Sequence, residues 1–411
     1  MIGQFAWLTC GRLFAAVLQA FTFGALALAV NPVTLGAVGT ALAVLLVLQT
    51  VCDLGVATYL VRTRATDPHG GRIRAGVAVN RITTVPLFLL AALVALAVGS
   101  WSTAVSGLVL LPLAVWAAAE RNAETVAGLA VADGRAGISV ANLVSRRVVA
   151  LVVFAALAWQ GADPVLGYGI GMAVGALVSV AWINAVMRAR IAPDRVALGV
   201  VVREARPYWA NSVAVQARNL DVAVVAGLAG AAAGGIYSLA SRLTVPLRLV
   251  PTSLAAALLP HAARASGTAE QARVRGTVYW LVAAISAVYL VLAAMMPTLV
   301  QSSSLFEEFA PAILPIQILL VALPFGAVAS VATSLLQAQG YAGFVSWTAA
   351  LMSAVCLVGA AIGAVVAGAA GAALAFGAAL ALQALVLTSK LVAVHRTRDT
   401  TGRQPRTMSH A

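Results

Sequence analysis

Six charged residues interrupt long apolar runs of this chain, and their surroundings limit the chemistry they can do. These residues are Arg12, Asp53, Arg218, Asp221, Arg242 and Arg248. A charged side chain at the centre of a bilayer costs about 2.5–3.5 kcal/mol. Six such side chains facing lipid would together cost more than the whole stability of a typical domain. We therefore expect all six to face a protein interior or a water-filled cavity.

The sign of these charges predicts what such a cavity binds. Four of the six residues are basic and two are acidic, so the cavity is expected to be cationic and its cargo anionic. A guanidinium group matches two oxygens of a phosphate at the same time. We therefore predict that Arg12, Arg218, Arg242 and Arg248 bind substrate, with phosphate as the group they hold.

Helical spacing supports a shared, wet surface. Asn211, Arg218 and Asp221 are seven and three residues apart, which places them on one side of a helix with about 3.6 residues per turn. The same spacing of polar residues recurs in the first apolar run. One-sided polar helices in both halves of a chain are typical of a cavity between two bundles. In an alternative reading, Arg218 and Asp221 are a local ion pair that only neutralises itself.

Three further arginines, Arg81, Arg146 and Arg147, stand near the ends of apolar runs. Long basic side chains at such positions extend along the helix to reach the polar interface. We expect these three arginines to lie at the membrane surface rather than inside the bundle.

The overall composition requires a membrane protein. Of 411 residues, 62% are hydrophobic and 9% are charged, and the mean hydropathy is +0.98. A soluble domain needs about 25% charged residues, so a soluble enzyme is excluded. An outer-membrane barrel is excluded as well, because its strands alternate apolar and polar residues. The net charge of +13 fits cationic loops on the cytoplasmic side better than nucleic-acid binding.

Twelve segments are long and apolar enough to span a bilayer, which takes about 20 residues per helix. The predicted spans are 5–30, 35–61, 76–99, 102–119, 137–159, 164–187, 207–229, 235–260, 277–299, 313–338, 343–366 and 370–394. We predict an all-α integral membrane protein in which two six-helix lobes, 1–198 and 199–394, enclose a central cavity. Residues 395–411 are expected to be a disordered basic tail that contacts anionic lipids.

The connections between these spans alternate in charge. Nearly all loop arginines lie in 62–75, 120–136, 188–206, 261–276 and the tail, and the intervening connections contain no Lys or Arg. Basic connections stay in the cytoplasm. Both termini are therefore predicted to be cytoplasmic, and the expected location is a bacterial cytoplasmic membrane.

Sites for cofactors or metals are not expected. The three cysteines Cys10, Cys52 and Cys356 are scattered among apolar residues, and the four histidines form no cluster with them. No Gly-rich ATP-binding loop with its Lys-Ser or Lys-Thr is present. We predict no cofactor, no metal and no enzymatic activity.

Several short motifs, in order, carry a resemblance to a known family. Residues 219–264 contain an Asp in an apolar helix (Asp221), a Gly-x-Tyr, an Ala-x-Arg that ends at Arg242, and a Leu-Pro. Asp53 begins an Asp-Leu-Gly, and Gly-x-x-Gly-Ala-Ala occurs near the start of the last span. Together these motifs resemble the polysaccharide transporter family of repeat-unit flippases, within the multidrug/oligosaccharidyl-lipid/polysaccharide exporter superfamily.

The resemblance implies a function. Members carry polyprenyl-diphosphate-linked oligosaccharide from the cytoplasmic to the outer leaflet by alternating access. By this resemblance Asp53 and Asp221 are candidates for ion or proton coupling. Partners would include the lipid-linked glycan, a polysaccharide polymerase and glycosyltransferases.

Other functions remain open at this stage. A lipid II flippase of the same superfamily would have two more spans than this chain. A drug or cation antiporter would require an acidic cavity, which the arginine excess argues against. A membrane glycosyltransferase or polymerase would require longer outer loops than the short connections predicted here.

Overall fold

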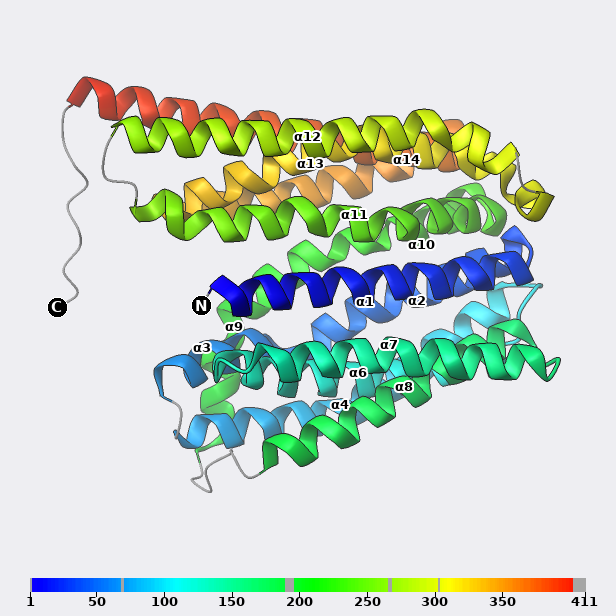
Figure 1. Cartoon of the computed structure of the whole chain (residues 1–411). Helices are drawn as coiled ribbons and strands as arrows, with labels where there is room; N and C mark the ends of the chain where they lie inside the picture. Colours follow the sequence, from blue (N-terminus) through cyan, green and yellow to red (C-terminus); the bar gives the residue numbers. More distant parts are fainter. Residues whose placement is uncertain (1, 68–69, 189–195, 265–267, 302–303, 402–411) are drawn as a thin grey trace.

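The computed structural model describes residues 2–67, 70–188, 196–264, 268–301 and 304–401. These residues form long helices that run roughly parallel to one another, joined by short connections (Figure 1). The prediction of an all-α membrane protein is confirmed. Eight helical stretches of the described residues are long and apolar enough to cross a membrane.

The first half of the chain makes six passes. Its elements are α1 (Ile2–Ala29), α2 (Pro32–Asp53), α3 (Val56–Thr66), α4 (Gly71–Trp101), α5 (Gly107–Leu110), α6 (Pro112–Ala132), α7 (Ala136–Trp159) and α8 (Pro164–Met187). The helices α2 and α3 form one pass, as do α5 and α6. Within this half α6 packs against α2, α3, α4, α7 and α8, so it is the most enclosed helix of the group.

The second half also makes six passes. Its elements are α9 (Leu198–Gln216), η2 (Ala217–Leu220), α10 (Asp221–Ala229), α11 (Ala231–Arg264), α12 (Thr268–Gln301), η3 (Ser304–Ala312), α13 (Ile313–Ala338) and α14 (Ala342–Thr401). The first three elements form one pass. The helix α14 counts twice, because non-helical φ and ψ at Ala367 and Gly368 divide it into two spans.

Local sequence signals set the starts of several helices. The side chain of Asn31 accepts a hydrogen bond from Thr34 N at 2.8 Å, and Pro32 follows at the first helical position of α2. Asp163 and Pro164 start α8 in the same way, with Leu166 N as the donor. A short polar cap satisfies a free N–H group at the helix start, and proline has no N–H to leave unpaired there.

The start of α1 and the end of α14 lie at the same end of the bundle (Figure 1). The last turns of α3, α6, α8 and α11 and the first turns of the helices that follow them also lie at that end. These are the regions that the charge pattern assigned to the cytoplasm. The shared end agrees with the twelve-pass order, while its cytoplasmic placement stays a prediction. We call it the inner end and the opposite one the outer end.

The two halves touch closely at the outer end, through α2 and α11. A Cβ placed on Gly36 would lie 1.9 Å from the carbonyl oxygen of Ala231, and one on Gly235 would lie 1.9 Å from that of Pro32. Only glycine permits such backbone contact between two helices. Residues 34–43 of α2 are all buried, whereas 46–53 are only half-buried. The halves are therefore packed together at the outer end and more open toward the inner end.

Two sequence-based boundaries differ from the structure. The predicted span 102–119 is a short helix followed by α6, which continues to Ala132, so most of the expected cytoplasmic connection 120–136 is helical. The predicted disordered tail is helical to Thr401, and its remainder lies outside the described residues. The helices α6 and α14 thus both continue past the charged residues at which the sequence predicts that the membrane spans end.

Candidate functional site

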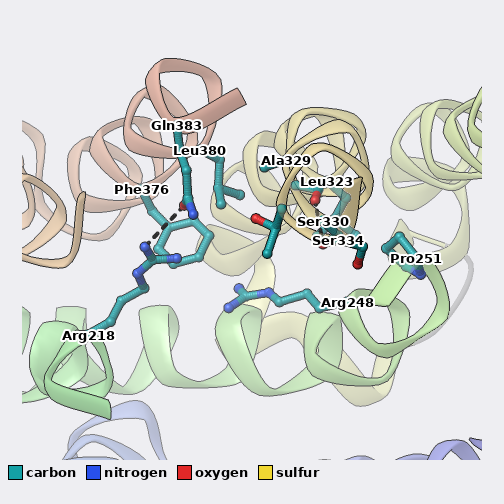
Figure 2. Close-up of a pocket in the computed structure, with 12 residues that line it drawn as sticks. Arg218, Arg248, Pro251, Leu323, Ala329, Ser330, Ser334, Phe376, Leu380 and Gln383 are labelled. Atoms are coloured by element: carbon teal, nitrogen blue, oxygen red, sulfur yellow. Dashed lines mark hydrogen bonds between the residues drawn. The ribbon is translucent and has the colours of Figure 1, made fainter. Parts of the chain in front are cut away.

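A pocket of about 350 Å³ lies within the second half of the chain. Arg218 on the η2 turn and Arg248 on α11 point toward it, and Phe376 and Gln383 on α14 lie opposite them (Figure 2). The helix α13 completes the wall with Leu323, Gly326, Ala329, Ser330, Thr333 and Ser334. The pocket thus combines two cations with hydroxyl groups inside an apolar bundle.

Neutral groups are among the contacts of the two arginines. The Cζ atoms of Arg248 and Arg218 lie 4.4 and 5.9 Å from the centre of the Phe376 ring. Arg218 donates a hydrogen bond to Gln383 Oε1 at 3.4 Å, and Arg248 donates one to Thr244 Oγ1 at 3.1 Å. These contacts orient the guanidinium groups, and the buried carboxylate of Asp221 interacts electrostatically with both of them. A phosphate-bearing ligand would supply the opposite charge and the oxygen acceptors.

Arg242 lies outside this pocket, where the two halves of the chain meet. It is half-buried on α11, and its Cζ atom lies 5.0 Å from the ring centre of Phe23 on α1. Phe23 in turn packs edge-on against Tyr168 of α8, with ring centres 6.2 Å apart. Arg242 therefore reaches from the second half of the chain to aromatic residues of the first.

Arg12 is exposed on α1 and does not line the pocket. It precedes Phe23 by eleven residues, or three helical turns, so both side chains lie on the same face of α1. Phe23 is 1% exposed, so this face is covered toward the outer end and open toward the inner end. The structure thus brings Arg218 and Arg248 together, and it leaves Arg242 and Arg12 at separate places.

Asp221 is buried at the start of α10. Its carboxylate accepts hydrogen bonds from the Tyr237 hydroxyl at 2.8 Å and from Val222 N at 2.7 Å. A 3₁₀ turn, Ala217–Leu220, separates it from α9, so the continuous-helix spacing used in the sequence analysis does not apply. No direct salt bridge joins Asp221 to Arg218 in the part of the chain that the structure describes. Arg218 still interacts electrostatically with the Asp221 carboxylate, so the local ion-pair alternative stays a hypothesis. The side chain of Asn211 lies outside the described residues.

Asp53 ends α2 and shapes the turn into α3. Its Oδ2 accepts a hydrogen bond from Ala57 N at 3.2 Å, and its Oδ1 lies 3.6 Å from Arg121 Nε on α6. Leu54 and Gly55 then take left-handed conformations, with φ of 53° and 76°. The Asp-Leu-Gly motif thus interrupts the helix between α2 and α3 and caps α3, and its carboxylate is paired with an arginine in this structure.

A family profile described as "Polysaccharide biosynthesis protein" matches residues 3–266, which is more than half of the chain. The chain belongs to this family. This agrees with the family resemblance carried by the motifs around Asp53, Asp221 and Arg242. No curated protein sequence matches the chain.

Solved structures similar to this family member are transporters. An inward-facing multidrug resistance MATE family transporter of the MOP superfamily is 15% identical, with a TM-score of 0.72 over 95% of this chain and 96% of that one. A MOP superfamily transporter from Pyrococcus furiosus is 15% identical, with a TM-score of 0.65 over 96% of both chains. The lipid II flippase MurJ is 11% identical, with a TM-score of 0.70 over 95% of this chain and 86% of that one. At these identities the likeness establishes the fold, which is a transporter fold.

The first half of this chain contains a buried network of charged residues on α6 and α7 that was not predicted from the sequence. Glu120 of α6 binds Arg147 of α7 through two hydrogen bonds, of 2.6 and 3.2 Å, and also accepts one from Trp116. Arg146 lies 3.6 Å from Glu120 and 3.1 Å from Glu124. The expectation that Arg146 and Arg147 reach the membrane surface is therefore wrong. Arg81 is exposed, as expected.

A signal for this network was present in the sequence. Trp116, Glu120 and Glu124 are each four residues apart, and such spacing places them on one face of a helix. Because of their charge, Glu120 and Glu124 are predicted from the sequence to lie in the cytoplasmic connection 120–136. They lie instead within α6, where Arg146 and Arg147, about 15 Å along α7 from its inner end, neutralise them.

Proposed function

We propose that this protein moves polyprenyl-diphosphate-linked oligosaccharide repeat units from the cytoplasmic to the outer leaflet of a bacterial cytoplasmic membrane. The observation that carries the proposal is the placement of Arg218 and Arg248 over one aromatic ring, at a pocket inside an apolar bundle. Two adjacent guanidinium groups match the two charged phosphates of a diphosphate. Hydroxyl groups on α13 suit sugar hydroxyls, and the apolar bundle suits the lipid.

Alternating access gives the movement a mechanism. Residues 1–198 and 199–394 act as two lobes that rock around the site, as in other transporters built from two related halves. The lobes are packed at the outer end through Gly36 and Gly235 and are looser at the inner end, which suits loading from the cytoplasmic leaflet. Asp53 and Asp221 couple this movement to that of an ion or proton. Glycosyltransferases act on the glycan before transport, and a polymerase acts on it afterwards.

The polarity of the pocket separates this proposal from export of organic cations. Its two charged lining residues are both arginines, so a cationic drug would be repelled. One of the similar structures is described as a MOP superfamily transporter in which reverse polarity of the binding pocket suggests a different function. That description fits a superfamily in which pocket charge selects the class of cargo.

The proposal is tested by deleting the gene and complementing it with variants. Lipid-linked oligosaccharides are quantified by mass spectrometry beside surface polysaccharide. We expect the deletion, and complementation with Arg218→Ala/Arg248→Ala, to accumulate a completed repeat unit and to lose surface glycan. Each charged hydrogen bond contributes about 1.5–3 kcal/mol, so the double variant should slow transport at least tenfold. Arg81→Ala removes an exposed arginine outside the pocket and should restore export.

Either of two results would contradict the proposal. An accumulated glycan that is incomplete would place the defect at sugar transfer. Normal export by well-expressed Arg218→Ala/Arg248→Ala protein would show that the pocket does not hold the diphosphate.

A further inference from the structure

The buried charges of the first half do not balance unless an accessible carboxylate is included. Glu120 is satisfied without Arg146, since Arg147 binds both of its oxygens and Trp116 donates to one of them. The side chains of Glu120 and Arg147 are 5% and 7% exposed. Arg146, 2% exposed, is thus a surplus buried cation, and the carboxylate nearest to it is that of Glu124.

Glu124 differs from Glu120 in its access to solvent. Its side chain is 58% exposed, and it is the exposed residue within 113–130, where the others are buried or half-buried. The helix α6 is in contact with five neighbouring helices, so the exposure of Glu124 shows that these helices leave this side chain uncovered. Glu124 lies eight residues before the inner end of α6, which is about 12 Å along the helix axis.

Residues of α3 and α7 lie near Glu124 on either side. One turn after Glu124, a Cβ on Gly128 would lie 2.9 Å from the side chain of Val61 on α3. On the other side, Arg146 of α7 donates a hydrogen bond to Glu124 Oε1 at 3.1 Å. The buried Nε of Arg146 has no hydrogen-bond partner among the described residues. The guanidinium group therefore has an unused donor and one partner that can turn into water.

We propose that Arg146 is a second anion-binding subsite, in the first half of the chain, which Glu124 occupies until a phosphate group replaces it. This inference rests on the proposed function, and it adds a second anion-binding site to the pocket formed by Arg218 and Arg248. Arg146 and Arg147 differ in the accessibility of their carboxylate partners: Arg147 binds both oxygens of the buried Glu120, while Arg146 can exchange the exposed carboxylate of Glu124 for another anion. A cation in this position is more stable beside a counter-ion, which favours occupation of the subsite by Glu124 or by the cargo.

Such an exchange would make binding selective for anions that replace a carboxylate well. A phosphate offers more oxygens to the guanidinium than Glu124 does and binds it through two parallel hydrogen bonds. A neutral glycan cannot replace Glu124 at all. The subsite thus distinguishes a charged lipid-linked precursor from an uncharged sugar.

The test uses the full-length protein in lipid nanodiscs and inorganic pyrophosphate as the probe, with affinity measured by calorimetry. Variants are compared in the wild-type protein and in an Arg218→Ala/Arg248→Ala background, which removes the first pocket. In that background we expect residual binding that Glu124→Gln tightens about two- to fivefold, because an accessible ion pair of this kind competes only modestly. Arg146→Gln should abolish the residual binding. Glu308→Gln, which removes an exposed carboxylate outside the bundle core, should leave it unchanged.

The outcomes separate this inference from the proposed function. Wild-type binding that disappears completely in the double-arginine background would overturn the second subsite and leave the first pocket in place. Residual binding whose affinity is unchanged by both Glu124→Gln and Arg146→Gln would also overturn the second subsite. Full wild-type affinity in the double-arginine background, with sensitivity to Arg146→Gln, would support the second subsite and contradict the assignment of Arg218 and Arg248. Absence of binding to the wild type would overturn both proposals.

Discussion

Glu120 is the residue on which the charge balance of the first half depends. Replacing it with glutamine would leave Arg147, and in part Arg146, buried beside a neutral group. Breaking a buried pair by removing one partner costs about 3–5 kcal/mol. We expect Glu120→Gln to lower the free energy of unfolding by that amount, measured by denaturant unfolding in detergent micelles.

The matched control for this change lies one helical turn away. Glu124→Gln removes the same charge from the same helix, but the side chain is 58% exposed, so water can solvate Arg146 in its place. An accessible ion pair contributes about 0–1 kcal/mol. Equal losses of stability in the two variants would show that burial does not distinguish the two carboxylates.

At this scale hydropathy alone identifies some site residues and misses others. Arg218 and Arg248 stand out because each interrupts an apolar run, and the structure places both at one pocket. Glu120 and Arg121 escape notice because they adjoin other polar residues, Asn122 and Glu124, and the group looks like a loop. Whether such a group is a loop or a buried network depends on charges of another helix, in this case Arg146 and Arg147. That pairing depends on how the two helices pack, and the spacing of residues in the sequence does not show it.

At the scale of elements, the crossing of α2 and α11 depends on two glycines. A Cβ on Gly36 would overlap the backbone of Ala231, and α2 or α11 would have to move to accommodate it. Overpacking of this kind costs about 1–3 kcal/mol. We expect Gly36→Ala to lower the melting temperature of the purified protein and to separate the outer ends, detected as increased labelling of a cysteine placed at Thr34.

Gly227→Ala provides the control, since a Cβ on this helical glycine of α10 meets nothing within 4 Å. Alanine is favoured over glycine in a helix by about 0.5–1 kcal/mol. The control should therefore keep or slightly raise the melting temperature. A drop as large as that of Gly36→Ala would show that the loss comes from glycine content rather than from the helix crossing.

A second contact between elements holds α9 to the first half at the inner end. Glu204 of α9 accepts a hydrogen bond from the Tyr59 hydroxyl at 2.6 Å and lies 3.3 Å from Arg72. Arg62 donates to the Tyr208 hydroxyl at 3.0 Å, and Trp209 donates to the carbonyl oxygen of Val51 at 2.9 Å. The first turns of α9 thus pack on α2, α3 and α4, although α9 begins the second half.

This contact should weaken in acid. The hydrogen bond from Tyr59, helped by Arg72, lowers the pKa of Glu204 below its usual value of 4.5. A carboxyl with a lowered folded pKa stabilises the contact above its unfolded value and loses that effect as the pH falls through the lowered pKa. We expect hydrogen exchange of the first turns of α9 to accelerate over that range below pH 4.5, measured by mass spectrometry. Glu204→Gln should exchange faster at neutral pH and lose this acid dependence.

The number and order of the passes follow from the sequence because each needs only a long apolar run between polar connections. The structure confirms even the short connection at 367–369, where Gly368 has φ of 57°. The break at Ala217–Leu220 was not predicted. Apolar residues continue on both sides of this break, so hydropathy gives no signal for it.

At the scale of the whole molecule, the two halves meet at the outer end and the face of α1 that carries Arg12 opens toward the inner end. Arg12 and Phe23 share this face, yet Arg12 is exposed and Phe23 is 1% exposed. A membrane-impermeant thiol reagent should therefore label Arg12→Cys and spare Phe23→Cys. Both variants are made after replacing Cys10, Cys52 and Cys356 with serine.

The side from which labelling occurs tests the orientation of the molecule. The helix ends that adjoin the arginine-rich segments lie at the same end of the bundle as the start of α1 (Figure 1), so the positive-inside rule predicts that this end is cytoplasmic. Arg12→Cys should then react in inside-out vesicles and stay unreacted in intact cells. Labelling of Arg12→Cys in intact cells but not in inside-out vesicles would show that the orientation is the opposite one. Equal labelling of Arg12→Cys and Phe23→Cys would show that the difference between the open inner end and the packed outer end does not persist in the membrane. If the protein carries a lipid diphosphate as proposed, adding that lipid should slow the reaction at Arg12→Cys, because this face of α1 would lie on the route from the inner end to Arg218 and Arg248.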